Sequence, residues 1–344
     1  MTLVFILLGG VGSTGLLWAA SNRLEESTHR LSERYGIPDA VRGSLFMAVA
    51  SSMPELATGI LALGVHEDFE LGMSAIVGSA IYNILVIPAC SVFARGQPLR
   101  ANKELIYREA QFYLVSVLAL MVVLSLAVIY FGPAPLVLDG RRVFLGELTR
   151  GLALIPLVLY GIYLYLQYVE VRDGLVERPA KPDLKVTKEW LALIWSTALI
   201  LVGVEILLRV AIALGEILNT PTFLWGMTVV ATATSLPDTF VSIKAAAAGR
   251  IESSLTNVLG SNVFDLLVAV PAAVLVAGAT EINFTQVVPM MTFLVGATIV
   301  MLLLMRRGME LARGDAVIMM ALYVAFGLWM TSEAFGVTNL LGLR

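Results

Sequence analysis

The chain has 344 residues, a mean hydropathy of +0.86 and only 14% charged residues, whereas soluble domains carry about 25%. This composition excludes an ordinary soluble domain. The net charge of −3 argues against a nucleic-acid partner, and a single cysteine, Cys90, excludes an internal disulfide.

Apolar runs of roughly 20 residues, long enough to cross a bilayer, recur along the whole chain. The first run lacks a preceding basic region and continues into charged residues, so we expect a retained helix and not a cleaved signal peptide. In chain order we predict ten transmembrane helices, at residues 2–21, 37–65, 69–94, 108–131, 145–169, 189–213, 222–248, 252–278, 284–305 and 314–333.

The basic residues predict the orientation of these helices. Positive charge gathers on the cytoplasmic side of a membrane protein, and most of the 23 Lys and Arg residues fall in connections on the same side as the segment 171–188. We therefore expect a multi-pass protein of the plasma (cell) membrane with both termini outside. The basic residues on the other side are Arg141, Arg142, Arg150, Arg209 and Arg344.

Two related polar motifs interrupt apolar spans. The second span contains Ser51-Ser52-Met53-Pro54-Glu55, and the seventh contains Thr234-Ser235-Leu236-Pro237-Asp238. The third span contains Gly78-Ser79-Ala80-Ile81-Tyr82-Asn83, and the eighth contains Gly260-Ser261-Asn262-Val263-Phe264-Asp265. The first pair of motifs is offset by 183 residues and the second by 182, so the chain is a duplication.

This duplication predicts the fold class, an all-α integral membrane protein whose ten transmembrane helices form two inverted five-helix repeats. An odd number of spans in each repeat forces the second copy to insert upside down, as in many secondary transporters. The predicted parts are the first repeat at 1–170, with motifs at 48–83; a cytoplasmic linker at 171–188; and the second repeat at 189–344, with motifs at 231–265.

The motifs carry oxygen ligands at membrane depth. Ionisable residues there are costly and usually line a polar pathway, and each proline weakens the helix so that backbone carbonyls become available to a cation. Oxygen ligands without His or Cys suit a hard cation such as Ca2+ or Na+. His29 and His66 fall in or near predicted connections and are not expected to be ligands.

The third and eighth spans complete the predicted site. A spacing of four places Ser79 with Asn83, and Ser261 with Asp265, on one helix face. We expect the carboxylates Glu55, Asp238 and Asp265 to converge, a set that fits a divalent ion or several monovalent ions in its place. Without a cation these groups repel one another, so exchange is expected and free leakage is not.

At these motifs the chain resembles the cation/Ca2+ exchanger superfamily, whose repeats carry a Gly/Ala-Thr/Ser-Ser-x-Pro-Glu/Asp motif and a Gly-Ser-Asn-x-x-Asn/Asp motif. The segments 51–55, 78–83 and 260–265 look most like those of the potassium-dependent Na+/Ca2+ exchangers. Ala80 departs from the pattern, since the general motif has asparagine there. The predicted linker is also short, whereas animal exchangers have a large regulatory loop.

The resemblance implies roles for individual residues. It implies Glu55 and Asp238 as central Ca2+ ligands, completed by the carbonyls of Ser51 and Thr234, with Asn83 and Asp265 flanking the centre. It links Asp265 to K+ dependence, and it implies two central broken helices with mobile first and sixth spans. The Na+ ligands it implies are Ser52, Ser79, Ser235, Ser261 and the carbonyls of Ala48 and Ala231.

The expected function is secondary-active antiport and not enzyme catalysis, with no cofactor: Na+, with K+ as a candidate co-substrate, is exchanged for Ca2+. The partners are inorganic cations and the lipid bilayer; the oligomeric state is unknown. The alternative is an H+/Ca2+ exchanger of the same fold, because intramembrane carboxylates can carry protons. Ranked lower are an intramembrane aspartyl protease, which leaves the first-repeat motifs unexplained, and a cation channel, which usually arranges acids in a ring.

Overall fold

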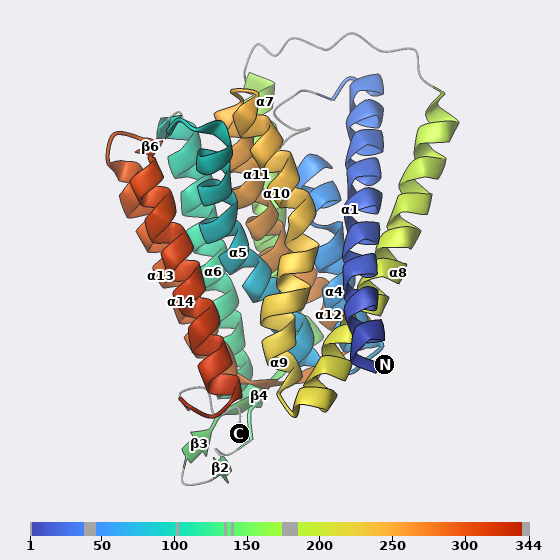
Figure 1. Ribbon diagram of the computed structural model, residues 1–344, viewed down its shortest axis with the longest axis vertical. Helices are drawn as coiled ribbons and strands as arrows, with labels where there is room; N and C mark the ends of the chain where they lie inside the picture. Colours follow the sequence, from blue (N-terminus) through green and yellow to red (C-terminus); the bar gives the residue numbers. More distant parts are fainter. Residues whose placement is uncertain are drawn as a thin grey trace.

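The computed structural model describes residues 2–37, 46–100, 103–133, 136–138, 141–173 and 185–338, and it is a bundle of helices (Figure 1). In the first half the helices are α1 (Thr2–Arg34), α3 (Ala48–Ser51), α4 (Met53–Gly64), α5 (Phe69–Arg95), α6 (Lys103–Phe131) and α7 (Arg150–Asp173). In the second half they are α8 (Val186–Leu218), α9 (Thr222–Trp225), α10 (Ala231–Ala247), α11 (Ile251–Phe264), α12 (Val270–Ala277), α13 (Phe284–Arg306) and α14 (Arg313–Ala334), with π-helical segments η2 (Gly226–Val230) and η3 (Asp265–Ala269).

The prediction of a helical membrane protein is confirmed. Within the described residues, eight helices are long and apolar enough to cross a membrane. The expected spans 37–65 and 222–248 are not among them; the first of these includes the shorter apolar helix Met53–Gly64. Residues 38–45 of the expected second span lie outside the described residues.

The first helix is longer than predicted. We expected a span at 2–21 followed by a connection, but α1 continues to Arg34 and therefore includes His29. The charged side chains of Arg23, Glu26 and Arg30 are paired within α1 and with α8, so they do not end the helix. The helices also extend into the predicted linker 171–188, because α7 reaches Asp173 and α8 begins at Val186; residues 174–184 lie outside the described part.

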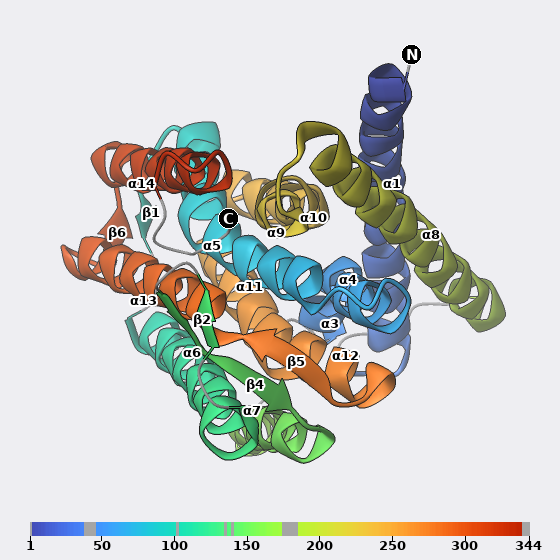
Figure 2. The ribbon, with the colours of Figure 1, turned by 90° about the horizontal axis from the view of Figure 1, so that it is seen from below.

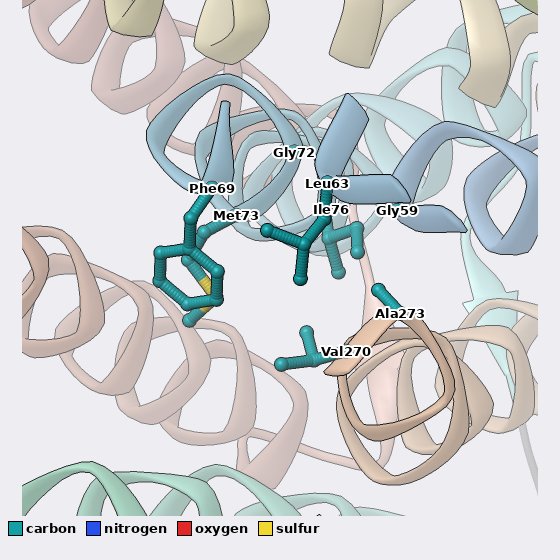
Figure 3. Close-up of a pocket in the computed structure, with 8 residues that line it drawn as sticks. All are labelled: Gly59, Leu63, Phe69, Gly72, Met73, Ile76, Val270 and Ala273. Atoms are coloured by element: carbon teal, nitrogen blue, oxygen red, sulfur yellow. The ribbon is translucent and has the colours of Figure 1, made fainter. Parts of the chain in front are cut away.

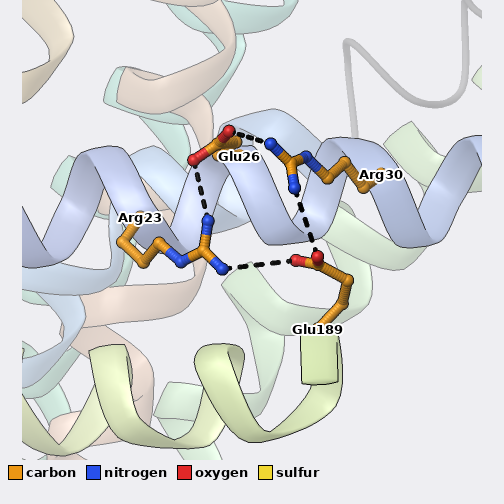
Figure 4. Close-up of polar contacts among 4 residues, drawn as sticks. All are labelled: Arg23, Glu26, Arg30 and Glu189. Carbon is orange, nitrogen blue, oxygen red and sulfur yellow. Dashed lines mark hydrogen bonds and ion pairs between the residues drawn. The ribbon is translucent and has the colours of Figure 1, made fainter. Parts of the chain in front are cut away.

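Four charged side chains join α1 to α8 (Figure 4). Glu189 of α8 is buried and faces two arginines of α1: its carboxylate lies 3.3 Å from Arg30 Nη1 and 3.8 Å from Arg23 Nη2. Glu26 pairs with both of these arginines from within α1. The network ties the two helices together at one end of the molecule.

We call that end the linker face, because α7 ends and α8 begins there; it is uppermost in Figure 1. The start of α1 and the end of α14 both lie at the opposite end (Figure 1). The helix α5 occupies the centre of the bundle and is buried along most of its length, while α1 and α8 pack against each other at one edge (Figure 2).

Short strands modify the all-α prediction. β1 (Leu99–Arg100) pairs with β6 (Glu310–Leu311), and β4 (Leu145–Leu148) pairs with β5 (Thr280–Asn283), all antiparallel. Each of these two ladders joins a connection of the first half to one of the second. A third ladder pairs β2 (Leu136–Leu138) with β3 (Arg141–Val143). The non-helical backbone of these connections thus forms hydrogen-bonded strand pairs, and it lies outside the apolar spans, where lipid would leave such groups unsatisfied.

A small cavity of about 10 Å³ lies where α4, α5 and α12 meet (Figure 3). Its lining is apolar and includes Leu63, Phe69 and Ile76. Because it offers no oxygen ligand, it is a packing defect and does not represent the cation site.

Candidate cation site

The first motif sits at a break between two helices. α3 ends at Ser51, Ser52 leaves the helical conformation with φ −87° and ψ 10°, and α4 begins with Pro54 in its first turn, where proline is tolerated. The Ala48 carbonyl accepts the Ser52 N–H at 3.1 Å and the Ser51 hydroxyl at 3.2 Å. A cation that uses this carbonyl must therefore displace the hydroxyl.

The second motif has the same hydroxyl contact on a different backbone. Thr234 Oγ1 donates to the Ala231 carbonyl at 3.2 Å, as its counterpart Ser51 does to Ala48. However, α10 continues through Pro237 without the break seen at Ser52, whereas π-helical residues precede both motifs, at 46–47 before Ala48 and in η2 before Ala231. The two motif helices are therefore not broken at equivalent residues.

The hydroxyls of each motif contact the serine of the other repeat. Ser51 Oγ lies 3.1 Å from Ser261 Oγ, and Ser52 Oγ donates to the Ser261 carbonyl at 3.5 Å. On the opposite side, Ser235 Oγ lies 2.7 Å from Ser79 Oγ. The motif sets from the two halves therefore form one buried polar cluster with approximate two-fold symmetry.

The carboxylates Glu55 and Asp238 lie within this cluster, each only 1% exposed. Glu55 Oε1 accepts from Ser79 Oγ at 3.2 Å, but Glu55 Oε2 and both Asp238 oxygens have no hydrogen-bond partner among the described residues. The two groups interact electrostatically with each other. Thr234 faces Glu55 as Ser51 faces Asp238. Buried carboxylate oxygens without partners are costly, and a cation held between them removes that cost.

Asn83 and Asp265 are fully buried beside this centre. Asp265 faces Ser52 and experiences the charges of Glu55 and Asp238, and neither of its oxygens has a hydrogen-bond partner in the described part of the chain. Yet no three His, Cys, Asp or Glu side chains in that part are close enough to hold one metal ion. In this arrangement the three carboxylates therefore do not gather around one point, and Asp265 stands apart from the central pair.

Asn262 belongs to the motif of the eighth span, and its role depends on contacts that the sequence does not reveal. Its side chain is fully buried, accepts from Asn83 Nδ2 at 3.0 Å and donates to the Ala80 carbonyl at 3.1 Å. It therefore spans from one repeat to the other. The sequence contains a sign of this difference between the repeats, because Ala80, the counterpart of Asn262, has no side-chain amide.

The two motif glycines differ in their surroundings. A Cβ on Gly78 would lie 2.5 Å from the Met227 carbonyl oxygen of η2, so only glycine allows α5 this approach. The contact is reciprocal, because a Cβ on Gly226 would lie 2.6 Å from the Leu71 carbonyl oxygen of α5. A Cβ on Gly260 would meet only Ala48 Cβ at 3.8 Å. A close approach to a neighbouring helical segment is therefore present at Gly78 and absent at Gly260.

Relatives of this chain were found among protein families and individual proteins. The family model described as "Sodium/calcium exchanger protein" matches residues 5–169 and 188–332. The Inner membrane protein YrbG of Escherichia coli (strain K12) is 25% identical over 316 residues, covering 87% of this chain and 89% of that protein. The human Sodium/potassium/calcium exchanger 3 is 37% identical over 97 residues, which cover 28% of this chain and 15% of that protein.

Solved structures share the fold. A structure of the sodium-calcium exchanger NCX_Mj, soaked with Na+ and Sr2+, aligns with a TM-score of 0.60 at 25% identity, covering 93% of this chain and 98% of that one. The structure of native YfkE aligns with a TM-score of 0.71 at 16% identity, covering 95% and 92%. Because the family model matches nearly all of the chain, the chain belongs to the sodium/calcium exchanger protein family and is a multi-pass membrane transporter, not an enzyme.

Proposed function

We propose that the protein is a secondary-active antiporter that exchanges Na+ for Ca2+ by alternating access. The observation that carries the proposal is the crossed contact between repeats, in which Ser51 and Ser52 meet Ser261. On the other side Ser235 meets Ser79, which in turn donates to Glu55. A site assembled from both halves can change its exposure when the halves move relative to each other, as in inverted-repeat transporters.

The proposed architecture is ten spans in two inverted five-helix repeats, at 1–170 and 189–344, joined by a cytoplasmic linker at 171–188. The strand ladders support this plan. β1 follows the third span and β5 follows the eighth; their partners β6 and β4 follow the ninth and fourth spans. Exchange of the two halves therefore converts one ladder into the other. We also propose that both termini are outside and that the linker face is cytoplasmic, from the distribution of Lys and Arg.

We propose that Glu55 and Asp238 ligate one Ca2+. Their two negative charges balance the ion, and the orphaned oxygens described above supply free lone pairs. The carbonyls of Ser51 and Thr234 complete the site from equivalent positions in the two repeats. Hard divalent cations take six to eight oxygen ligands at about 2.3–2.6 Å, so the side chains must close around the ion.

We propose that Na+ uses the surrounding hydroxyls. The candidate ligands are Ser52, Ser79, Ser235, Ser261 and the carbonyls of Ala48 and Ala231. Several of these groups are now bonded to one another, as in the 2.7 Å contact between Ser79 and Ser235. Na+ binding breaks those bonds and uses the same carboxylates, so the two cations compete for one set of oxygens. This competition favours exchange over uncoupled flow.

The moving part in this proposal is the pair α1 and α8. Gly9 and Gly10 of α1 pack on Val210 of α8, and the charged network around Glu189 ties the same two helices. Between this pair and α10 lies a groove of about 720 Å³, lined by apolar residues that include Leu214 and Leu236. The pair therefore has its own internal contacts and room beside the motif helix, which suits sliding as one body.

The test is Ca2+ uptake into liposomes driven by an outward Na+ gradient. Glu55→Gln and Asp238→Asn should each abolish uptake while the protein remains folded, because each removes one charge from the ion. The control is Glu252→Gln, the same chemical change at an exposed position of α11. Normal Na+-driven uptake by either site variant contradicts the assignment.

A second coupling ion is proposed at Asp265. This fully buried carboxylate carries one negative charge more than its neutral counterpart Asn83. The Tyr160 hydroxyl faces it and has no hydrogen-bond partner in the described part of the chain. A K+ ion or a proton balances that charge. Replacing Na+, K+ and H+ gradients one at a time in the same liposome assay separates Na+/Ca2+ exchange with K+ from its alternative, H+/Ca2+ exchange.

A further inference from the structure

Two polar residues of α1 are buried without partners. Ser21 and Glu25 are 0% and 6% exposed, and their spacing of four places them on one face of the helix. Neither Ser21 Oγ nor Glu25 Oε1 has a hydrogen-bond partner among the described residues. Buried polar atoms are almost always paired, so this face of α1 lacks a ligand that carries positive charge or donates hydrogen bonds.

The surroundings place this face between the linker face and the central carboxylates. Trp18 contacts Phe240 with ring centroids 5.7 Å apart, so this side of α1 packs on α10. Glu25 lies about two turns closer to the linker face than Trp18. Because helical side chains lean toward the N-terminus of their helix, its carboxylate extends back toward the centre of the protein. The charged groups that face it are Asp238 and Lys244, both on α10.

We infer that Glu25 and Ser21 form a second cation site, which holds an inorganic cation between the linker face and the central pair. This inference rests on the proposed exchange of Na+ and Ca2+. A carboxylate and a hydroxyl are hard-cation ligands. Asp238 adds attraction toward the centre, whereas Lys244 weakens the hold on the ion. Transport requires such a balance, since an ion must bind well enough to enter and weakly enough to leave.

The competing interpretation is a structural ion pair between Glu25 and Lys244. Lys244 is exposed, and Glu25 Oε1 makes no bond to it. The adjacent Glu26 shows what a structural carboxylate on α1 does, because it pairs with Arg23 and Arg30 at the surface. The two interpretations predict different effects when the Lys244 charge is removed. If Glu25 is a cation site, it binds a cation more tightly; if Glu25 and Lys244 form a structural ion pair, that pair is broken.

The first experiment measures equilibrium binding of radioactive Ca2+ to purified protein in which Glu55→Gln disables the central site. We expect weak residual binding that Glu25→Gln weakens by about tenfold or more, because affinity follows the charge of the ligand set. Ser21→Ala should weaken it less. Glu26→Gln is the matched control and should leave it unchanged, while Lys244→Gln should tighten it. Equal binding by the Glu25 and Glu26 variants overturns the inference.

The second experiment uses the otherwise unmodified protein in oriented liposomes. Glu25→Gln should raise the KM for Ca2+ supplied at the linker face and leave the KM at the opposite face unchanged. An equal rise at both faces, or loss of flux with Lys244→Gln as well, indicates a structural pair and contradicts the site. If the wild type shows no Na+-driven Ca2+ flux, the proposed function fails, while Glu25-dependent binding in the first experiment still supports the cation site.

Discussion

Gly78→Ala should destabilise the protein, whereas the equivalent change Gly260→Ala should not. The two glycines occupy the same motif position in the two repeats, so sequence alone predicts the same outcome for both. In the structure, an added Cβ at Gly78 lies 2.5 Å from the Met227 oxygen, 2.9 Å from Ala231 Cβ and 3.0 Å from Met227 Cα. Two of these atoms are backbone, so no side-chain rotation relieves the clash.

The expected magnitudes follow from two opposing effects. Overpacking that forces backbone shifts costs about 1–3 kcal/mol, and a clash with three atoms, two of them backbone, belongs near the upper value. Alanine gains about 1 kcal/mol over glycine within a helix. The net destabilisation for Gly78→Ala is therefore about 2 kcal/mol, or roughly 30-fold in the folding equilibrium. Gly260→Ala keeps the helix gain and makes only an ordinary contact at 3.8 Å.

The measurement is the thermal stability of both variants in detergent, with Ca2+ flux as a second readout. Separation of α5 from η2 also moves Ser79, which bonds to Glu55 and Ser235, so flux should fall for Gly78→Ala even at temperatures where it is folded. Equal stability and equal flux for the two alanine variants refute the close approach of α5 to η2 on which this reasoning depends.

Three further results are expected. Na+-driven Ca2+ flux should rise with K+, and Asp265→Asn should remove this effect while exchange persists; an unchanged rate when an inert organic cation replaces K+ rules out K+ coupling. Glu189→Gln should loosen α1 from α8 at a cost of about 1 kcal/mol or less, because its arginine partners are partly exposed, and hydrogen exchange in α1 measures this; unaltered exchange counts against the network. A rigid cross-link between α1 and α4 should stop transport, and normal flux in a fully cross-linked sample contradicts the sliding pair.

Much of the fold was predictable because it depends on periodic and repeated features. Apolar length located most of the helices, and the nearly equal offsets of the two motif pairs predicted that Glu55, Ser79, Ser235 and Ser261 lie together. The structure brings these side chains into one cluster. Such inferences succeed because a matched polar residue in an apolar span has few environments available other than a shared interior.

Other features depend on contacts between distant segments and were not predictable. The end of α1 was placed at residue 21 because the charges that follow are unfavourable in a span. Glu189, which lies 159 residues from Arg30 in sequence, satisfies those charges and allows the helix to continue. The same error concealed the burial of Glu25, because a charged residue in a connection is expected to be exposed to water. Likewise, the clash that makes glycine necessary at Gly78 depends on the position of η2.

The π-helical segment η3 coincides with a one-residue difference between the repeats. Asn83 and Asp265 are offset by 182 residues, but the prolines that follow them, Pro88 and Pro271, are offset by 183. The extra residue falls in η3, which begins at Asp265, and a π turn accommodates one more residue than an α turn because its hydrogen bonds span five residues. The repeats therefore differ in backbone and in charge at the same place. The central pair remains nearly symmetric, which suits an ion that both repeats hold equally, while the asymmetry is concentrated at Asp265. The proposed choice of coupling ion therefore depends on Asp265, the residue that the Asp265→Asn variant tests.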